Sequence, residues 1–275
     1  MRINYPEKFY DNRPSMIFIH GLCCNQTAWQ YSIAYLKDWF NCITIDLYES
    51  IGEPNHSNFE VANLTTLICE AIKSHQLSNL TICGHSFGGQ LAINICNEAP
   101  ELFEQAVLIA PAGIENYSHF EQLMINQGAR NLPTKLFTKI EEYLHLSFYH
   151  YDKHYRDLAI SLFSSFNKLD SESQKKFFST QLSEVLAANV NFKNKFNKPV
   201  LVIFGNMDSL VPNIVLHPYL TSRMMAAHTA RLFTHASYRL INDAGHFPML
   251  EQPEDVNQLI KKFAYTGTVT QPSQL

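Results

Sequence analysis

The sequence has little net charge, few charged residues and no long apolar run. Its 275 residues carry a formal net charge of −4, and charged residues make up only 17% of them. The basic excess of a nucleic-acid-binding domain is missing, and so is the high charge of a disordered chain. No stretch approaches the ~20 apolar residues of a membrane helix, and residues 1–8 lack a signal peptide's apolar core. We therefore expect a cytoplasmic globular protein that binds neither nucleic acid nor membranes.

The six cysteines have no regular spacing, so neither a zinc site nor a disulfide framework is indicated. Cys23 and Cys24 are adjacent, and the other four lie in apolar runs, where a free thiol behaves as a small buried hydrophobe: Cys42, Cys69, Cys83 and Cys96. Three histidines invite a metal-site interpretation: His145, His150 and His154. No carboxylate or cysteine completes a ligand set around them, so we expect six reduced thiols and no metal.

Short apolar runs alternate with helical patterns along most of the chain. Runs bounded by turn residues are typical of strands buried on both faces of a parallel sheet, and they cover residues 16–19, 41–46, 80–83, 106–110, 200–204 and 238–241. Helical patterns fall between or after these runs, over residues 59–76, 90–97 and 253–264. This order predicts an α/β fold with a mostly parallel central sheet flanked by helices.

Residues 112–196 interrupt that alternation. They contain no convincing strand, and helical patches cover residues 132–145, 158–166 and 173–190. We expect an all-helical cap inserted into a core of residues 1–111 and 197–265, with a flexible tail over residues 266–275. The cap holds 14 of the 34 aromatic residues. Their rings either line a substrate pocket or fasten the cap to the core.

The segment Gly84-His85-Ser86-Phe87-Gly88 has the pattern G-x-S-x-G between a predicted strand and a predicted helix. A sharp turn of this kind holds the serine hydroxyl at the C-terminal edge of the sheet, beside the start of a helix. Glycine is needed on both sides because the neighbouring backbone approaches too closely for a Cβ atom. Ser86 is therefore the candidate nucleophile.

A serine nucleophile needs a base and an acid that orients the base. His246 and Asp208 each follow a predicted parallel strand, so both leave the same edge of the sheet as Ser86. Two other acids are candidates. Asp243 is only three residues from His246 and would struggle to reach its far nitrogen, and Glu115 lies five residues beyond its strand. Asp208 is favoured.

The negative charge that develops on a substrate carbonyl needs two hydrogen-bond donors. The backbone N–H groups of Phe87, at the start of the helix, and of Leu22, in the loop after His20-Gly21, are the candidates. His20 itself is favoured as a core histidine rather than a catalytic one. Four further residues are candidates to line the substrate pocket: His85, Phe148, Leu210 and Phe247.

Together, residues 18–22, 84–89, 208–212 and 245–248 resemble the α/β-hydrolase superfamily, whose order is serine, acid, histidine. The resemblance implies a serine hydrolase of the carboxylesterase type that cleaves small-molecule esters without a cofactor. The modest cap and the D-x-L-V-P segment are similar to esterases that demethylate a pimeloyl ester on a carrier protein. A basic stripe would suit an acidic carrier, although a solvated helix face explains it equally well: Arg130, Lys135 and Lys139.

The sequence departs from the family pattern in two places. The loop over residues 46–53 lacks one expected glycine, and Asp208 and His246 are 38 residues apart, with the extra residues within 218–237. A serine nucleophile argues against haloalkane dehalogenases and epoxide hydrolases, which need an aspartate there. Three alternatives stay open: a thioesterase, a C–C bond hydrolase, and a small-ligand receptor on a hydrolase fold. The oligomeric state is not indicated.

Overall fold

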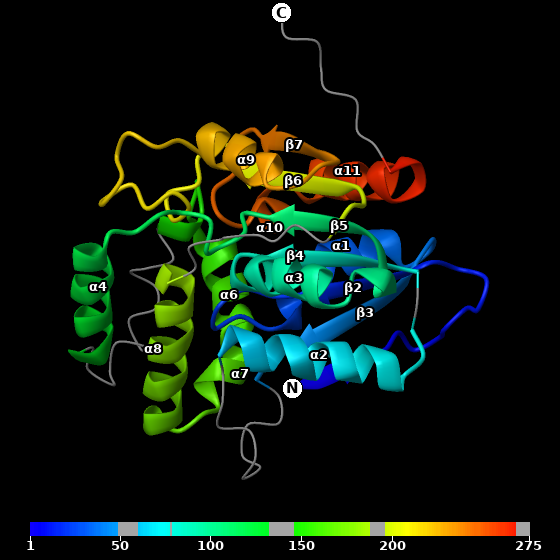
Figure 1. Ribbon diagram of the computed structural model, residues 1–275, viewed down its shortest axis with the longest axis horizontal. Coiled ribbons are helices and arrows are strands. Elements are labelled where there is room, and N and C mark those ends of the chain that lie inside the picture. The colour runs from blue at the N-terminus through cyan, green and yellow to red at the C-terminus, as the bar shows by residue number, and fades with distance from the viewer. Residues whose placement is uncertain (49–59, 78, 132–145, 188–195, 268–275) are drawn as a thin grey trace, which may run out of the picture.

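The computed structural model describes residues 1–48, 60–77, 79–131, 146–187 and 196–267 (Figure 1). The helix predicted over residues 132–145 lies outside these ranges, together with Lys135, Lys139 and His145, and so does most of the predicted tail. None of the described helices combines the length and apolar character needed to span a bilayer. Within the same ranges, no group of three or more His, Cys, Asp and Glu side chains could hold a metal ion.

A seven-stranded sheet in the order β1-β3-β2-β4-β5-β6-β7 forms the centre of the molecule. Its strands are β1 (Arg2–Asn4), β2 (Ser15–Ile19), β3 (Asn41–Asp46), β4 (Leu80–His85), β5 (Phe103–Ile109), β6 (Val200–Gly205) and β7 (Ala236–Ile241). Every neighbouring pair is parallel except β1 and β3. All residues of β2, β3, β4 and β6 are buried, as continuous apolar runs predict.

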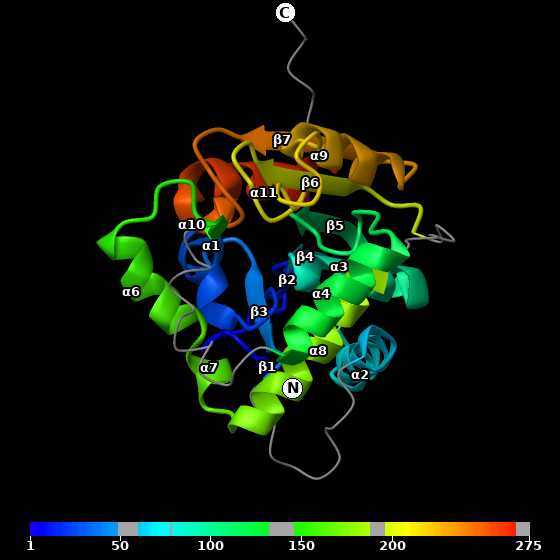
Figure 2. The same cartoon turned by 90° about the vertical axis from the view of Figure 1, so that its left-hand side faces the viewer.

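Helices cover both faces of this sheet (Figures 1 and 2). One face carries α2 (Val61–Ser74), α3 (Phe87–Glu98) and α9 (Ser222–Arg231), and the other carries α1 (Gln30–Leu36) and α11 (Pro253–Thr266). Short helices fill the connections: η1 (Gln26–Trp29), η2 (Pro100–Leu102) and α10 (Pro248–Glu251). The α/β class with a mostly parallel sheet between helices is therefore confirmed. Strand β1 was not predicted, because three half-exposed residues make no apolar run.

The segment between β5 and β6 is helical wherever it has regular structure in the described residues. It contains α4 (His119–Asn131), α6 (Lys153–Leu162), α7 (Ser164–Asn167) and α8 (Ser171–Ala187). Figure 1 shows these helices on the side to which the arrowheads of β3 and β5 point. Several aromatic rings of the segment are buried in the main hydrophobic core: Phe148, Phe163, Phe166, Phe177 and Phe196. These rings fasten the segment to the sheet, whereas the division of the chain into core and cap stays a prediction.

Candidate active site

Ser86 occupies the turn between β4 and α3. Its backbone has φ 52° and ψ −118°, a left-handed conformation that costs a non-glycine residue about 1–3 kcal/mol. Helix α3 begins at the next residue, three residues before the predicted start. A Cβ atom on Gly88 would lie 2.2 Å from the carbonyl oxygen of Ile19, so only glycine lets α3 approach β2 this closely. The turn holds Ser86 half-buried at the carboxyl edge of the sheet.

His246 and Asp208 are hydrogen-bonded to each other. His246 Nδ1 lies 2.9 Å from Asp208 Oδ2, and both side chains are buried. The other carboxylate oxygen, Oδ1, accepts the backbone N–H groups of Leu210 at 2.9 Å and Val211 at 3.1 Å. These bonds fix the carboxylate, which in turn holds the hydrogen on Nδ1 and leaves Nε2 of His246 as the proton acceptor.

His85, directly before Ser86, joins the serine turn to the histidine loop. Its Nε2–H donates to the main-chain oxygen of His246 at 2.9 Å, and the two rings are 4.9 Å apart. Complete burial lowers the pKa of His85 well below its ordinary value, and the nearby His246 lowers it further. His85 is therefore neutral. The loop after β2 passes close by, because a Cβ on Gly21 would lie 3.2 Å from Ser86 Cβ.

Glu251 anchors the histidine loop from the other side. Its Oε1 accepts the N–H groups of Gly245 at 2.9 Å and Phe247 at 3.3 Å, which flank His246 in the chain. Its Oε2 accepts the N–H of Tyr149 at 2.7 Å. Burial raises the pKa of Glu251, while the three N–H groups act in the opposite direction. This carboxylate was not singled out from the sequence.

The loop after β2, which passes close to the serine turn, contains the amide of Leu22, one of the two candidate oxyanion donors. Of the three amides that follow Gly21, Cys24 N–H donates to Gly21 O at 3.2 Å and Cys23 N–H donates to the Tyr48 hydroxyl at 2.6 Å. Leu22 N–H is the remaining one. Phe87 is the first residue of α3, so its N–H has no acceptor within the helix. The two amides expected to act as donors therefore come from segments that meet at Ser86.

His20 has a structural role in this loop. Its Nε2 accepts the Leu47 N–H at 3.0 Å, and its Nδ1–H therefore donates to Gly21 O at 2.9 Å. The ring is fully buried. It links the loop after β2 to the loop after β3, as a core histidine would.

Three of the four residues expected in the pocket form one aromatic stack beside His246. The rings of Phe148 and Phe247 stack 5.0 Å apart, and His85 lies 4.7 Å from Phe247. All three are buried. Leu210 is half-buried on a different loop and contributes its N–H to Asp208. The stack supports His246, and a role for these residues in binding substrate stays a prediction.

Glu115, the rival acid, fastens a different loop. It accepts the Asn213 N–H at 3.0 Å and the Tyr117 hydroxyl at 2.7 Å, and it is paired with His217 Nδ1. His217 Nε2 in turn lies 3.3 Å from Glu121 at the start of α4. This buried group holds the loop that follows Asp208 against the segment after β5. Glu115 and His217 are 102 residues apart, so no local pattern indicates the pair.

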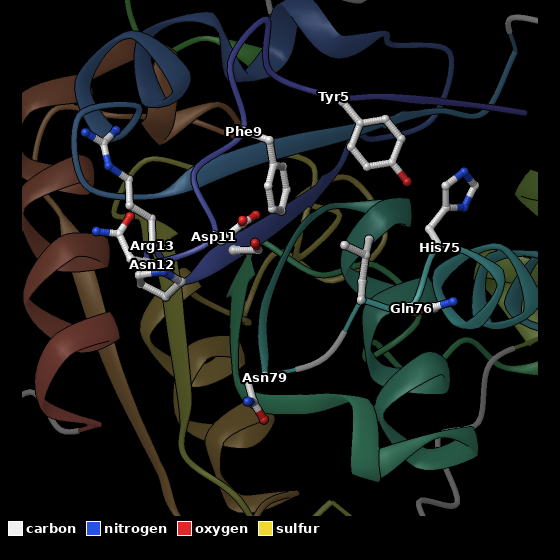
Figure 3. Close-up of a pocket in the computed structure, with 11 residues that line it drawn as sticks. Tyr5, Phe9, Asp11, Asn12, Arg13, His75, Gln76 and Asn79 are labelled. Atoms are coloured by element: carbon white, nitrogen blue, oxygen red, sulfur yellow. The ribbon is translucent and has the colours of Figure 1, made fainter.

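A cleft lies at the edge of the sheet opposite to Ser86 (Figure 3). This cleft has a volume of about 760 Å³ and is bordered by Ser15, where β2 begins, and Asn79, just before β4. Figure 3 shows the rings of Tyr5 and Phe9 beside it. Because Ser86, Asp208 and His246 follow the carboxyl ends of their strands, the cleft is separate from the candidate active site.

The fold is that of an α/β hydrolase, and Ser86, Asp208 and His246 follow β4, β6 and β7 in the chain order that this fold uses for its nucleophile, acid and histidine. The model of the alpha/beta hydrolase family matches residues 16–259. The chain belongs to this family, and it is a hydrolase.

Named relatives and solved structures are similar to most of the chain. The hydrolase YugF of Bacillus subtilis is 23% identical over 288 residues, covering 95% of this chain and 94% of that protein. A pimeloyl-[acyl-carrier protein] methyl ester esterase of Wigglesworthia glossinidia brevipalpis is 24% identical over 256 residues, covering 90% and 93%. A thermophilic esterase from Thermogutta terrifontis superposes with a TM-score of 0.75 at 17% identity, covering 97% and 94%.

Proposed function

We propose that this hydrolase cleaves carboxylic esters through an acyl-enzyme on Ser86. The observation that carries the proposal is the hydrogen bond between His246 Nδ1 and Asp208 Oδ2, formed beside a serine held in a left-handed turn. A buried carboxylate fixes the tautomer of the histidine, and the histidine can then take the proton of the serine hydroxyl. The substrate is a small-molecule ester, and none of the steps needs a metal or a cofactor.

In the first half-reaction, Ser86 Oγ attacks the ester carbonyl while His246 Nε2 takes the hydroxyl proton. His246 then gives that proton to the leaving alcohol as the ester C–O bond breaks, and the acyl group stays on Ser86. In the second half-reaction, a water molecule gives a proton to His246 and attacks the acyl carbonyl. The bond between the acyl carbon and Ser86 Oγ then breaks, and His246 returns the proton to that oxygen. The products are the carboxylic acid and free Ser86.

The backbone N–H groups of Leu22 and Phe87 stabilise the negative charge on the carbonyl oxygen in both half-reactions. Such donors are most effective when they are already aimed before the reaction, because no reorganisation is then needed. The start of α3 supports Phe87 in this role, since the dipole of the helix favours negative charge at its N-terminus.

The experiment is hydrolysis of p-nitrophenyl esters from acetate to laurate by wild type and Ser86→Ala. We expect a loss of at least ~1,000-fold in kcat in the variant, because the remaining groups cannot form an acyl-enzyme. Ser74→Ala, which removes an exposed hydroxyl from the end of α2, is the matched control and should keep full activity. Equal turnover by wild type and Ser86→Ala would refute the mechanism.

A second candidate substrate is a methyl ester of a pimeloyl-type acyl group on an acyl-carrier protein. The likeness to the esterase of Wigglesworthia glossinidia brevipalpis, which extends over 90% of this chain, favours it. The same ester series separates the two candidates. A preference for short chains supports a small-ester esterase, and a medium-chain optimum followed by release of methanol from a pimeloyl methyl ester supports the carrier-linked substrate.

A further inference from the structure

Tyr48 connects the loop after β2 to helix α8. The residue lies just after β3 and is 2% exposed. Its hydroxyl accepts the Cys23 N–H at 2.6 Å and lies 3.2 Å from Gln181 Oε1, to which it donates. Burial raises the pKa of Tyr48 well above its ordinary value, so the hydroxyl keeps the proton that it donates. One hydroxyl therefore bridges a loop of the core and a helix of the segment between β5 and β6.

The position of Tyr48 is fixed on all sides. Its own N–H donates to Asp46 Oδ1 at 2.9 Å. Its ring packs edge-on against Phe177 of α8 at 4.5 Å and Phe166 of α7 at 5.9 Å, and it lies 5.2 Å from His20. With the ring held in this way, the hydroxyl is a fixed acceptor for the Cys23 N–H.

The residue that donates this hydrogen bond to Tyr48 has a strained backbone. Cys23 has a φ of 60°, in the left-handed region that residues other than glycine rarely occupy. A strained residue stays in such a conformation only where the surroundings hold it. Leu22 and Cys23 are the two central residues of a turn in which Cys24 N–H donates to Gly21 O at 3.2 Å, so we expect a change in the Cys23 backbone to move the Leu22 amide as well. The hydrogen bond from Cys23 to Tyr48 therefore helps to fix the direction of the Leu22 N–H.

Gln181 carries the connection into α8. It is fully buried, and its Oε1 is the acceptor of the Tyr48 hydroxyl. Its Nε2 is buried without a hydrogen-bond partner among the described residues. A leucine at this position would remove the bond to Tyr48 and, with it, an unsatisfied buried donor. The leucine would also leave the buried Tyr48 hydroxyl without an acceptor, so we expect some loss of stability.

We propose that Tyr48 is a positioning residue for the oxyanion donor at Leu22, and that Gln181 makes this positioning depend on α8 being packed against the core. The inference rests on the proposed function, because it assigns Leu22 the role of donor. Tyr48 lies in the loop over residues 46–53, where the glycine expected for the family is missing.

The test compares Tyr48→Phe with Tyr31→Phe, which removes a hydroxyl that lies 3.4 Å from His154 of α6. For Tyr48→Phe on p-nitrophenyl butyrate, we expect kcat to fall about tenfold with KM within about twofold, because a donor is misaimed rather than removed. Affinity for an alkylboronic acid, whose adduct on Ser86 mimics the tetrahedral intermediate, should fall by the same factor. Tyr31→Phe should leave both quantities unchanged.

Gln181→Leu tests the link between Tyr48 and α8 with a second variant. It should lower kcat by about threefold, and the double variant should be no slower than Tyr48→Phe alone, because residues that act in one chain are not additive. Additive losses would overturn the link to α8. If Tyr48→Phe does not fold, the kcat and boronic acid affinity of Gln181→Leu decide the question.

Failure of the inference differs from failure of the proposed function. If a fluorophosphonate does not label Ser86 in the wild type, the acyl-enzyme mechanism fails and the role of Tyr48 fails with it. If Ser86 is labelled and Tyr48→Phe keeps wild-type kcat or wild-type affinity for the boronic acid, only the inference about Tyr48 is wrong.

Discussion

Gly205, the last residue of β6, packs against the loop that carries His246. An alanine at this position tests whether activity depends on this close backbone contact. A Cβ on Gly205 would lie 2.1 Å from Gly245 O and 2.3 Å from Ala244 O. The shorter distance is 0.9 Å below the 3.0 Å under which real Cβ contacts essentially never fall. The loop must therefore retreat by about 1 Å, since both atoms belong to the backbone.

That retreat is opposed by the bonds that hold the loop in place. Met207 N–H donates to Ala244 O at 3.0 Å, and His246 N–H donates to Ser147 O at 2.8 Å. A shift of about 1 Å would lengthen the 2.9 Å contact between His246 and Asp208 beyond hydrogen-bonding range. We expect Gly205→Ala to lose about 100-fold in kcat/KM, the effect of a misplacement of this size. Overpacking should cost about 1–3 kcal/mol of stability.

The assay is kcat/KM on a p-nitrophenyl ester together with the Tm of each variant. Gly128→Ala in α4 is the matched control, because its Cβ would meet nothing within 4 Å. Replacing a glycine inside a helix should raise stability by about 1 kcal/mol without changing activity. A Gly205→Ala protein with wild-type kcat/KM and wild-type Tm would refute the reasoning.

Two further predictions follow from buried groups. Glu251→Gln offers one acceptor oxygen where the carboxylate offers two, so it should cost about 1–3 kcal/mol and lower kcat about tenfold by loosening His246. Unchanged Tm and kcat would contradict this. Burial raises the pKa of the Cys24 and Cys42 thiols to about 12, whereas unfolded thiols ionise near pH ~8.5. Because only the unfolded chain releases these protons, the free energy of unfolding should be constant up to about pH 8 and lower by roughly 1.4 kcal/mol per thiol at pH 9.5. Urea titrations at pH 7.5 and 9.5 measure the drop in the free energy of unfolding between the two pH values. In the double variant Cys24→Ala, Cys42→Ala this drop should be smaller than in the wild type by roughly 3 kcal/mol. An equal drop in the two proteins would rule the prediction out.

The central strands could be predicted because their signal is local. Each of β2, β3, β4 and β6 is a run of buried residues, and position in a parallel sheet follows from the alternation with helices. Strand β1 could not be predicted, because a short edge strand needs no apolar face. The start of α3 was placed too late because two glycines, Gly88 and Gly89, suggest a loop rather than a helix.

In the candidate site, too, some residues could be predicted from the sequence and others could not. Ser86, Asp208 and His246 could be singled out because each follows a strand at one edge of the sheet. The residues that hold them could not, because their partners are distant in sequence: 102 residues separate Glu251 from Tyr149, and 133 separate Tyr48 from Gln181. A glutamate or a tyrosine in a loop has no local signal for such a bond. Hydrogen-bonded support of this kind emerges only once the chain is folded.

Hydrogen bonds join the loops after β2 and β3 to the segment between β5 and β6. They limit how well that segment can be replaced by the corresponding segment of another hydrolase. Asn25 Nδ2 donates to Ser161 O at 2.8 Å and to Ser164 Oγ at 3.0 Å, which adds to the bond between Tyr48 and Gln181. A chimera that carries this segment from another hydrolase would leave Asn25 and Tyr48 with missing partners. We therefore expect a chimera to keep its activity best when the segment and the two core loops are exchanged together as one block.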